Sequence, residues 1–155
     1  MLIFLDAGPL GMLTSPAATA KNTAIAEWML TQLGKGVGFR VPEVADYEVR
    51  RSLILENLAA GLQRLNEFTQ TADYVAINTD AMRVAADLWA MVRGLKPPQP
   101  TAATEELDCD AVLAGQAIVT SNGEEEEIII ATDNIGHLSR FETDTVKAMK
   151  WTDIN

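Results

Sequence analysis

Acidic residues follow the two most apolar runs of this 155-residue sequence. Residues 2–5 are followed by Asp6, and residues 128–131 are followed, after one threonine, by Asp133 and Asn134. Ligands of open parallel sheets bind beyond the carboxyl ends of the strands. We therefore expect Asp6 and Asp133 to meet if these runs are neighbouring parallel strands. Each residue also has a simpler explanation, because Asp and Asn commonly cap a following helix.

A third acid, Glu48, lies in a predicted helix over residues 42–55. It stands four residues after Val44 and seven before Leu55, so helical spacing places it on an apolar stripe. A carboxylate on a buried stripe is costly unless it is paired or coordinates a cation. Arg51, three residues later, is one available partner, and a metal ion is the other.

A fourth acid, Asp110, begins an apolar stripe in a predicted helix over residues 105–119. The stripe continues at helical spacing through Leu113, Ala114, Ala117 and Ile118. Asp110 is therefore expected to point in the direction of the core-facing residues. Its neighbour Asp108 is on another face and is expected to be an ordinary first-turn carboxylate. Cys109, between them, is expected to be inert packing.

Hydrolysis of a phosphodiester is the chemistry that such a group of carboxylates suits. The reaction needs an activated water, a stabilised leaving oxygen and less charge on the phosphate, and one or two Mg²⁺ ions can supply all three. Mg²⁺ prefers oxygen ligands, usually a few carboxylates with waters and substrate phosphates. We assign Asp6 and Asp110 as direct ligands, and Glu48 as a ligand through water or as the residue that orients the attacking water. Arg50 and Arg51 are the nearest cations for substrate phosphates, although surface solvation is the simpler role for at least one of them.

Apolar runs and helix-period segments alternate along the chain, which predicts a parallel sheet covered by helices on both faces. The strand-like runs are residues 2–6, 37–41, 74–77, 127–131 and 145–151. The helical segments are residues 17–34, a stretch that begins near 43, residues 79–93 and residues 105–119. A proline-rich stretch over 94–104 and a glutamate-rich stretch over 121–127 are predicted to be surface loops.

Composition indicates one domain over residues 1–155, because 48% hydrophobic residues can build a core at this length. One cysteine permits no internal disulfide, and one histidine leaves no Cys/His zinc site. We expect a cytoplasmic protein without a signal peptide or membrane span. The formal net charge of −10 opposes broad attraction to nucleic acid, unless bound divalent cations neutralise clustered carboxylates.

The order and spacing of these segments resemble the PIN-domain family, in particular the VapC-like toxin ribonucleases of toxin–antitoxin pairs. The resemblance spans nearly the whole chain and is carried by residues 2–6, 41–43, 47–51, 110–114 and 130–134, with Phe141 after them. It implies an α/β fold, a three-layer α/β/α sandwich with a central, mainly parallel five-stranded sheet. It also implies Mg²⁺ or Mn²⁺ dependence, cleavage of single-stranded RNA, a small antitoxin partner and a homodimer.

Two positions depart from the family pattern. Ala7 stands where the family usually has Thr or Ser, so a hydroxyl that would support the metal ligands is missing. In the last motif the family's Asp or Asn is two residues after the threonine, which is Asn134 here, whereas the acid is Asp133. The fourth ligand is therefore either Asp133 or Asn134.

Other functions fit the residues less well. A phosphatase of the haloacid dehalogenase type needs a second Asp at the position of Gly8, and a Ser-His-Asp hydrolase would depend on His137, which we expect at a loop or helix end. The main alternative is a PIN-like domain that has lost catalysis and binds RNA or protein. Ala7 and the net charge favour that alternative, whereas the three acids Asp6, Glu48 and Asp110 oppose it.

Overall fold

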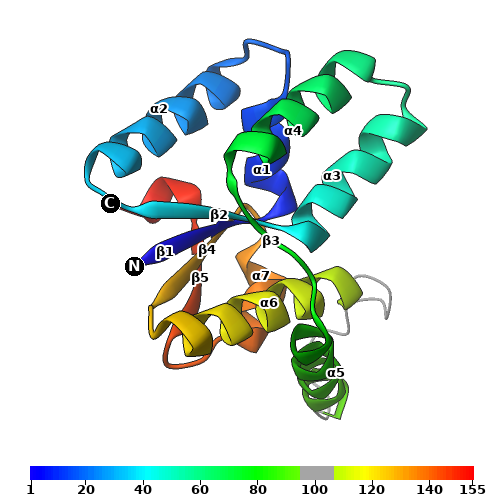
Figure 1. Cartoon of the computed structure of the whole chain (residues 1–155), viewed down its shortest axis with the longest axis vertical. Helices are drawn as coiled ribbons and strands as arrows, with labels where there is room; N and C mark the ends of the chain where they lie inside the picture. Colours follow the sequence, from blue (N-terminus) through cyan, green and yellow to red (C-terminus); the bar gives the residue numbers. More distant parts are fainter. Residues whose placement is uncertain (95–106) are drawn as a thin grey trace.

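A five-stranded, wholly parallel sheet lies between two layers of helices in the computed structural model, which describes residues 1–94 and 107–155 (Figure 1). The strands stand in the order β3-β2-β1-β4-β5. Their bounds are β1 Leu2–Leu5, β2 Gly38–Pro42, β3 Asp73–Val75, β4 Ile128–Thr132 and β5 Val146–Lys150. This architecture confirms the predicted α/β/α sandwich.

Helices α1 to α4 lie on one side of the sheet, and α5 to α7 on the other (Figure 1). Their bounds are α1 Ala7–Thr14, α2 Ala20–Gly34, α3 Glu43–Leu55, α4 Ala59–Thr71, α5 Thr79–Gly94, α6 Asp108–Glu124 and α7 Ile135–Leu138. Two 3-10 helices complete the described chain, η2 Ser139–Phe141 and η3 Trp151–Asp153. Over the described ranges, no helix combines the length and the apolar character that crossing a membrane requires.

The apolar core is divided by the sheet, because successive side chains of a strand point to opposite faces. Ile3 and Leu5 of β1 pack with residues of α1, α2 and α4, whereas Leu2 and Phe4 pack with residues of α6 and α7. The strand β1 is buried along its whole length between β2 and β4. Consequently the residue that follows β1 leaves the sheet at the centre of its carboxyl edge.

Helices α5 and α6 approach each other closely at Gly115. A Cβ atom at this position would overlap the backbone oxygen of Ala81 and lie 3.1 Å from the nitrogen of Ala85. Only glycine allows this approach without a backbone shift. The contact fixes α6, and with it the first turn that carries Asp110.

Three local features differ from the sequence predictions. The short helix α1 was not predicted, since Gly8, Pro9 and Gly11 disfavour helix in a segment of eight residues. The stretch after residue 43 divides into α3 and α4, with Asn57 in the left-handed region between them. Residues 121–124, predicted as loop, continue α6 until Glu125 adopts a left-handed conformation and ends it. Apart from Gly94, which ends α5, the predicted loop over residues 94–104 lies outside the described residues.

Candidate metal-binding and catalytic site

Asp6 leaves β1 at the carboxyl edge of the sheet and caps α1. Its Oδ1 accepts a hydrogen bond from the backbone N–H of Ala7 at 2.7 Å, and its Oδ2 accepts one from the hydroxyl of Thr132 at 2.6 Å. Thr132 is the last residue of the neighbouring strand β4. Asp6 therefore both caps α1 and contacts the end of the neighbouring strand β4. The two hydrogen bonds hold its side chain from two sides. A hydroxyl does contact this acid, but it comes from β4 and not from residue 7.

A pocket of about 460 Å³ opens beside Asp6. Its lining residues are Asp6, Ala7, Glu48, Arg51, Cys109, Asp110, Asn134 and His137. They belong to the β1–α1 junction, α3, α6 and the segment that includes α7, which are distant in sequence. The structure thus brings Asp6, Glu48 and Asp110 to one cavity.

Glu48 reaches this pocket from α3, although the stripe predicted for it was wrong. Leu55 is 81% exposed and does not belong to the core, although Val44 at the other end of the predicted stripe is buried. The Glu48 side chain is 24% exposed because it borders the pocket. Its Oε1 lies 3.4 Å from Nη2 of Arg51, which is the partner that the sequence suggested.

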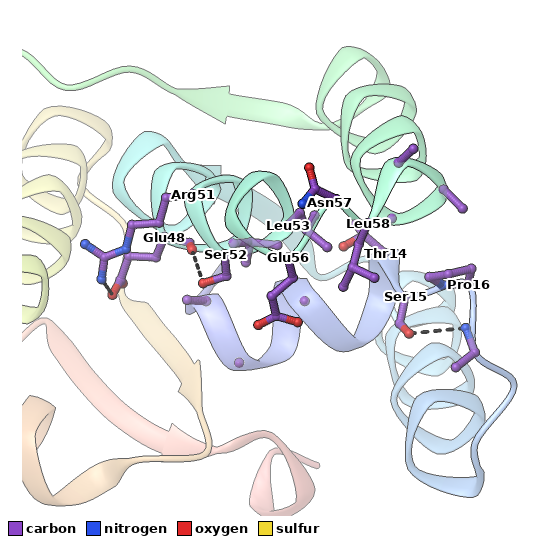
Figure 2. A pocket seen from close by; sticks show the side chains of 18 residues that line it. Thr14, Ser15, Pro16, Glu48, Arg51, Ser52, Leu53, Glu56, Asn57 and Leu58 are labelled. Atoms are coloured by element: carbon purple, nitrogen blue, oxygen red, sulfur yellow. Dashed lines mark hydrogen bonds and ion pairs between the residues drawn. The ribbon is translucent and has the colours of Figure 1, made fainter.

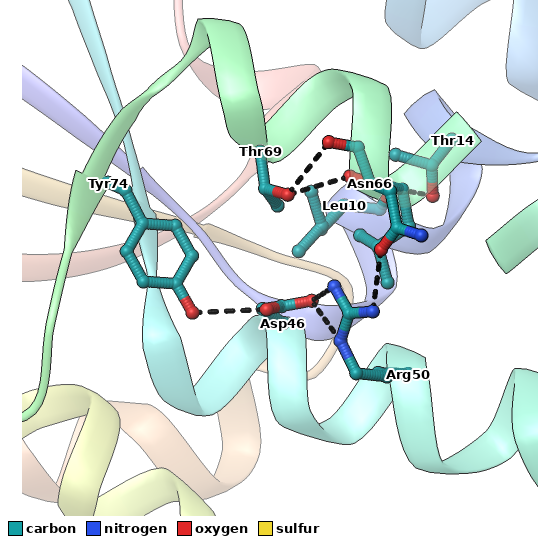
Figure 3. A network of polar contacts seen from close by, with 8 residues as sticks. Leu10, Thr14, Asp46, Arg50, Asn66, Thr69 and Tyr74 are labelled. Atoms are coloured by element: carbon teal, nitrogen blue, oxygen red, sulfur yellow. Dashed lines mark hydrogen bonds and ion pairs between the residues drawn. The ribbon is translucent and has the colours of Figure 1, made fainter. Parts of the chain in front are cut away.

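A polar network anchors α3 to α4 and β3 (Figure 3). The carboxylate of Asp46, which is buried, accepts hydrogen bonds from Nε and Nη2 of Arg50 at 3.1 and 2.9 Å, and from the hydroxyl of Tyr74 at 3.0 Å. Arg50 also donates to Asn66 of α4 at 2.6 Å. Arg50, predicted to contact substrate phosphates, is therefore engaged in this network and does not line the pocket, whereas Arg51 does.

Asp110 faces His137 across the pocket. Its Oδ2 lies 3.1 Å from Nδ1 of His137, and Nδ2 of Asn134 lies 3.4 Å from the same nitrogen. The predicted stripe behind Asp110 is present, because Leu113, Ala114 and Ala117 are buried. The sequence reasoning missed His137 as a site residue. Its position three residues after Asn134 was the available signal, since residues at that spacing share a helix face.

Burial, together with the charge of a neighbouring acid, raises the pKa of all three acids. Burial raises the pKa of Asp6, although the hydrogen bonds from Thr132 and Ala7 oppose this. Burial and the charge of Asp6 raise the pKa of Glu48, and Arg51 opposes them. Burial and the charge of Asp6 raise the pKa of Asp110 to about 6, while His137 opposes them. Clustered carboxylates with raised pKa values are a common feature of functional sites.

The donors in this pocket suit a divalent cation of the Mg²⁺ type. In residues 1–94 and 107–155, no three His, Cys, Asp or Glu side chains converge closely enough to form a complete metal cage. Mg²⁺ does not require one, because it usually keeps several waters and is bound through one or two carboxylates. Asp6 and Asp110 offer the carboxylates, and a bound cation would offset the burial, and for Asp110 the charge of Asp6, that raise their pKa values.

Asp133 and Asn134, the two candidates for the fourth ligand, lie in different surroundings. Asn134 lines the pocket, whereas Asp133 is not among the lining residues. The Asp133 carboxylate lies 2.9 Å from Nζ of Lys21 and accepts a hydrogen bond from Nε1 of Trp151 at 3.2 Å. The structure therefore brings Asn134, and not Asp133, to the cavity with the other acids.

A larger groove of about 800 Å³ adjoins the pocket between α1 and the α3–α4 connection (Figure 2). Ala7, Glu48 and Arg51 line both cavities and join them. Away from this junction the groove is lined mainly by small and apolar side chains, including Leu53 and Leu58. The groove extends from Arg51 at one end to Pro16 at the other, as Figure 2 shows.

Comparison with known proteins identifies the fold. No protein-family model matches the sequence, and no curated protein matches it. A chain in the crystal structure of VapBC2 from Rickettsia felis, bound to a DNA fragment from their promoter, superposes with a TM-score of 0.66 at 13% identity, over 97% of this chain and 99% of that one. A chain of VapBC-1 from nontypeable Haemophilus influenzae gives 0.67 at 15% identity, over 99% and 100%. The chain therefore has the PIN-like fold that its sequence suggested, shared over nearly its whole length with a chain of each of these complexes.

Proposed function

We propose that this protein is a divalent-metal-dependent endoribonuclease that cleaves single-stranded RNA. The observation that carries the proposal is the meeting of Asp6, Glu48 and Asp110 in one pocket, with raised pKa values. Such a cluster has no structural benefit by itself, because burial and like charge both oppose ionisation. A bound cation would stabilise the ionised carboxylates and could bind a phosphate substrate, which explains the cluster. The shared fold supports the same function.

Each residue of the pocket has a role in this proposal. Asp6 and Asp110 hold Mg²⁺ or Mn²⁺, with the amide oxygen of Asn134 as a third donor. The cation, when bound, supplies Lewis-acid polarisation of the phosphate and lowers the pKa of a coordinated water. Glu48 orients the attacking water and accepts its proton, a role that its raised pKa suits. Arg51, half in solvent beside Glu48, binds the negative phosphate oxygens.

A cleavage assay with matched variants tests this proposal. Purified wild-type protein should cut a defined single-stranded RNA with Mg²⁺ or Mn²⁺ and not with a chelator. Asp110→Asn should remove cleavage, because it deletes a ligand charge without changing shape. Asp108→Asn is the control, since Asp108 is an exposed acid in the same helical turn. If RNA binds but is never cut, the protein is the inactive binding module that the sequence left open.

We further propose that the protein is the toxin of a toxin–antitoxin pair. Two similar structures are VapBC complexes, and the apolar groove that joins the pocket offers a place for a partner's apolar segment. Expression of the chain alone should slow bacterial growth, and co-expression of a small partner protein should restore it. Normal growth with abundant, RNA-cleaving protein would instead indicate a nuclease without a toxin role.

A homodimer is the assembly that we propose. Large apolar side chains are exposed on α3, where Tyr47 and Ile54 are 55% and 57% exposed and share a helix face at a spacing of seven residues. Exposed apolar surface of this kind is a common mark of an interface. Light scattering should give twice the mass of the chain, and Ile54→Glu should reduce that mass to one chain.

A further inference from the structure

The segment Thr132–Asn134 sends its three side chains in different directions. The Thr132 hydroxyl donates to Asp6, and it also accepts a hydrogen bond from the backbone N–H of Asn134 at 2.8 Å. The Asn134 side chain lines the pocket. The Asp133 carboxylate contacts Lys21 of α2 and Trp151 of the 3-10 helix η3 and does not line the pocket, although its charge still acts on Asp6. Asp133 and Asn134 therefore have different surroundings, and of these two residues only Asn134 lines the pocket.

Two side chains from distant segments hold Asp133 in this direction. Lys21, in the first turn of α2, approaches Oδ2 at 2.9 Å, and Trp151 donates its indole N–H to Oδ1 at 3.2 Å. Both oxygens of the carboxylate are thus engaged. The Lys21 side chain is 59% exposed, so its ion pair contributes little on its own. Trp151 is only 7% exposed, so its indole is the firmer of the two contacts.

The position of Trp151 is itself fixed by α2. Its ring packs against Trp28, with 5.8 Å between ring centroids. The indole N–H of Trp28 and the amide of Gln32 both donate to the backbone oxygen of Ile154, each at 3.1 Å. These contacts fasten the segment after β5 to α2. The indole that holds Asp133 is therefore part of a rigid arrangement and not of a free tail.

We propose that Asp133 is a positioning residue, clamped by Lys21 and Trp151 so that Asn134 is presented to the metal-binding pocket. The segment over residues 151–154 thereby becomes a support of the site, although it contributes no lining residue. The inference rests on the proposed metal-dependent function. It replaces the expectation that Asp133 binds the cation directly.

Comparison of two substitutions at Asp133 separates positioning from direct ligation. Asp133→Asn and Asp133→Ala remove the same charge, but only the amide can still accept the indole hydrogen bond. Loss of a residue that orients a ligand typically weakens metal binding about 10-fold or more. We expect Asp133→Ala to weaken Mn²⁺ binding by about 10-fold, and Asp133→Asn to lose clearly less than that. Isothermal titration calorimetry with Mn²⁺ measures both, without any need for cleavage.

Trp151→Phe provides the second arm of the experiment. It keeps an aromatic ring against Trp28 and removes the N–H that binds Asp133, so Mn²⁺ binding should weaken in the same direction as in Asp133→Ala. Asp153→Ala is the matched control, because it removes an exposed carboxylate from the same 3-10 helix. Circular dichroism of every variant verifies the fold, and the Asp133 pair decides the question if Trp151→Phe does not fold.

Direct ligation predicts a different ranking. If Asp133 binds the ion, Asp133→Asn should lose most of the Mn²⁺ affinity that Asp133→Ala loses, because its amide oxygen can still ligate but the charge beside the ion is gone. Trp151→Phe should then leave Mn²⁺ binding unchanged, because it keeps the carboxylate. That result would overturn the clamp, as would wild-type affinity in all of these variants. Absence of Mn²⁺ binding by the wild-type protein would instead overturn the proposed function, and the positioning role with it.

Discussion

Asp110 shows how strongly a single residue in this pocket depends on its surroundings. Burial and the charge of Asp6 raise its pKa to about 6, so the folded chain binds this proton more tightly than the unfolded chain does. Between pH 4 and 6 the folded state therefore carries more protons, and stability falls as the pH rises through this window. Melting of metal-free protein, followed by circular dichroism in a chelator, should show this fall. In Asp110→Asn it should be smaller, whereas Asp108→Asn should keep the wild-type slope.

The same residue predicts the response to metal. A ligand that binds only the folded state adds about 2.7 kcal/mol at one hundred times its dissociation constant. Each kcal/mol shifts the midpoint by roughly 2–4 °C at this chain length, so saturating Mn²⁺ should raise it by roughly 5–11 °C. Asp110→Asn should melt higher than wild type without metal, because one repelling charge is gone, and should gain less from Mn²⁺. A midpoint that ignores Mn²⁺ would mean that these acids are only caps and ion-pair partners.

Residue types and spacing alone identified part of this site. Asp6 and Asp110 were predictable because apolar runs and helical periods define strand ends and helix faces. Glu48 does line the pocket, but the reason given for choosing it was wrong, since Leu55 is exposed and forms no buried stripe with it. The pairing of His137 with Asp110, and of Asp133 with Trp151, could not be predicted, because these contacts exist only after α6, α7 and η3 have packed.

At the scale of elements, the contact between α5 and α6 determines where the first turn of α6 lies. Gly115→Ala should destabilise the fold by about 1–3 kcal/mol, the usual cost of overpacking, because its methyl group would overlap the backbone of Ala81. Gly123→Ala, in the same helix with nothing within 4 Å of the added Cβ, should be neutral or stabilising. Urea denaturation of the two variants measures the difference, and equal stabilities would show that the helices can separate at little cost.

The network under α3 predicts a second effect at this scale. Tyr74→Phe removes one hydrogen bond to the buried carboxylate of Asp46, and hydrogen bonds to charged groups contribute about 1.5–3 kcal/mol. Burial and the Asp46 charge raise the pKa of Tyr74 well above its usual value, so the hydroxyl remains a donor at neutral pH. Urea denaturation should therefore show a loss of this size. A change below roughly 0.5 kcal/mol, the effect of an ordinary surface substitution, would mean that Arg50 alone satisfies Asp46.

At the scale of the whole molecule, the net charge of −10 sets the conditions for contact with RNA. Basic nucleic-acid-binding proteins lose affinity as the salt concentration rises. Their Lys and Arg side chains displace counterions from the phosphates, and this release is less favourable at higher salt. The RNA affinity of this protein should depend on salt differently when a chelator removes divalent metal, because salt then screens the repulsion between the acidic protein and the RNA phosphates. Fluorescence anisotropy with single-stranded RNA should give weak binding that does not fall between 50 and 200 mM salt, a range in which basic proteins lose affinity about 10³-fold or more. A steep fall would reveal a cationic RNA path that the net charge conceals.

The strand order has a consequence for biosynthesis. β1 lies in the middle of the sheet between β2 and β4, although β4 is translated only after α6. In a growing chain β1 therefore cannot pair with β4 until late in translation. Until then Asp6 lacks the hydrogen bond from Thr132, and Asn134 is absent from the pocket. Domains generally fold as units once their segments have emerged. If the chain cuts RNA, it is harmless to the ribosome that makes it until synthesis has passed β4.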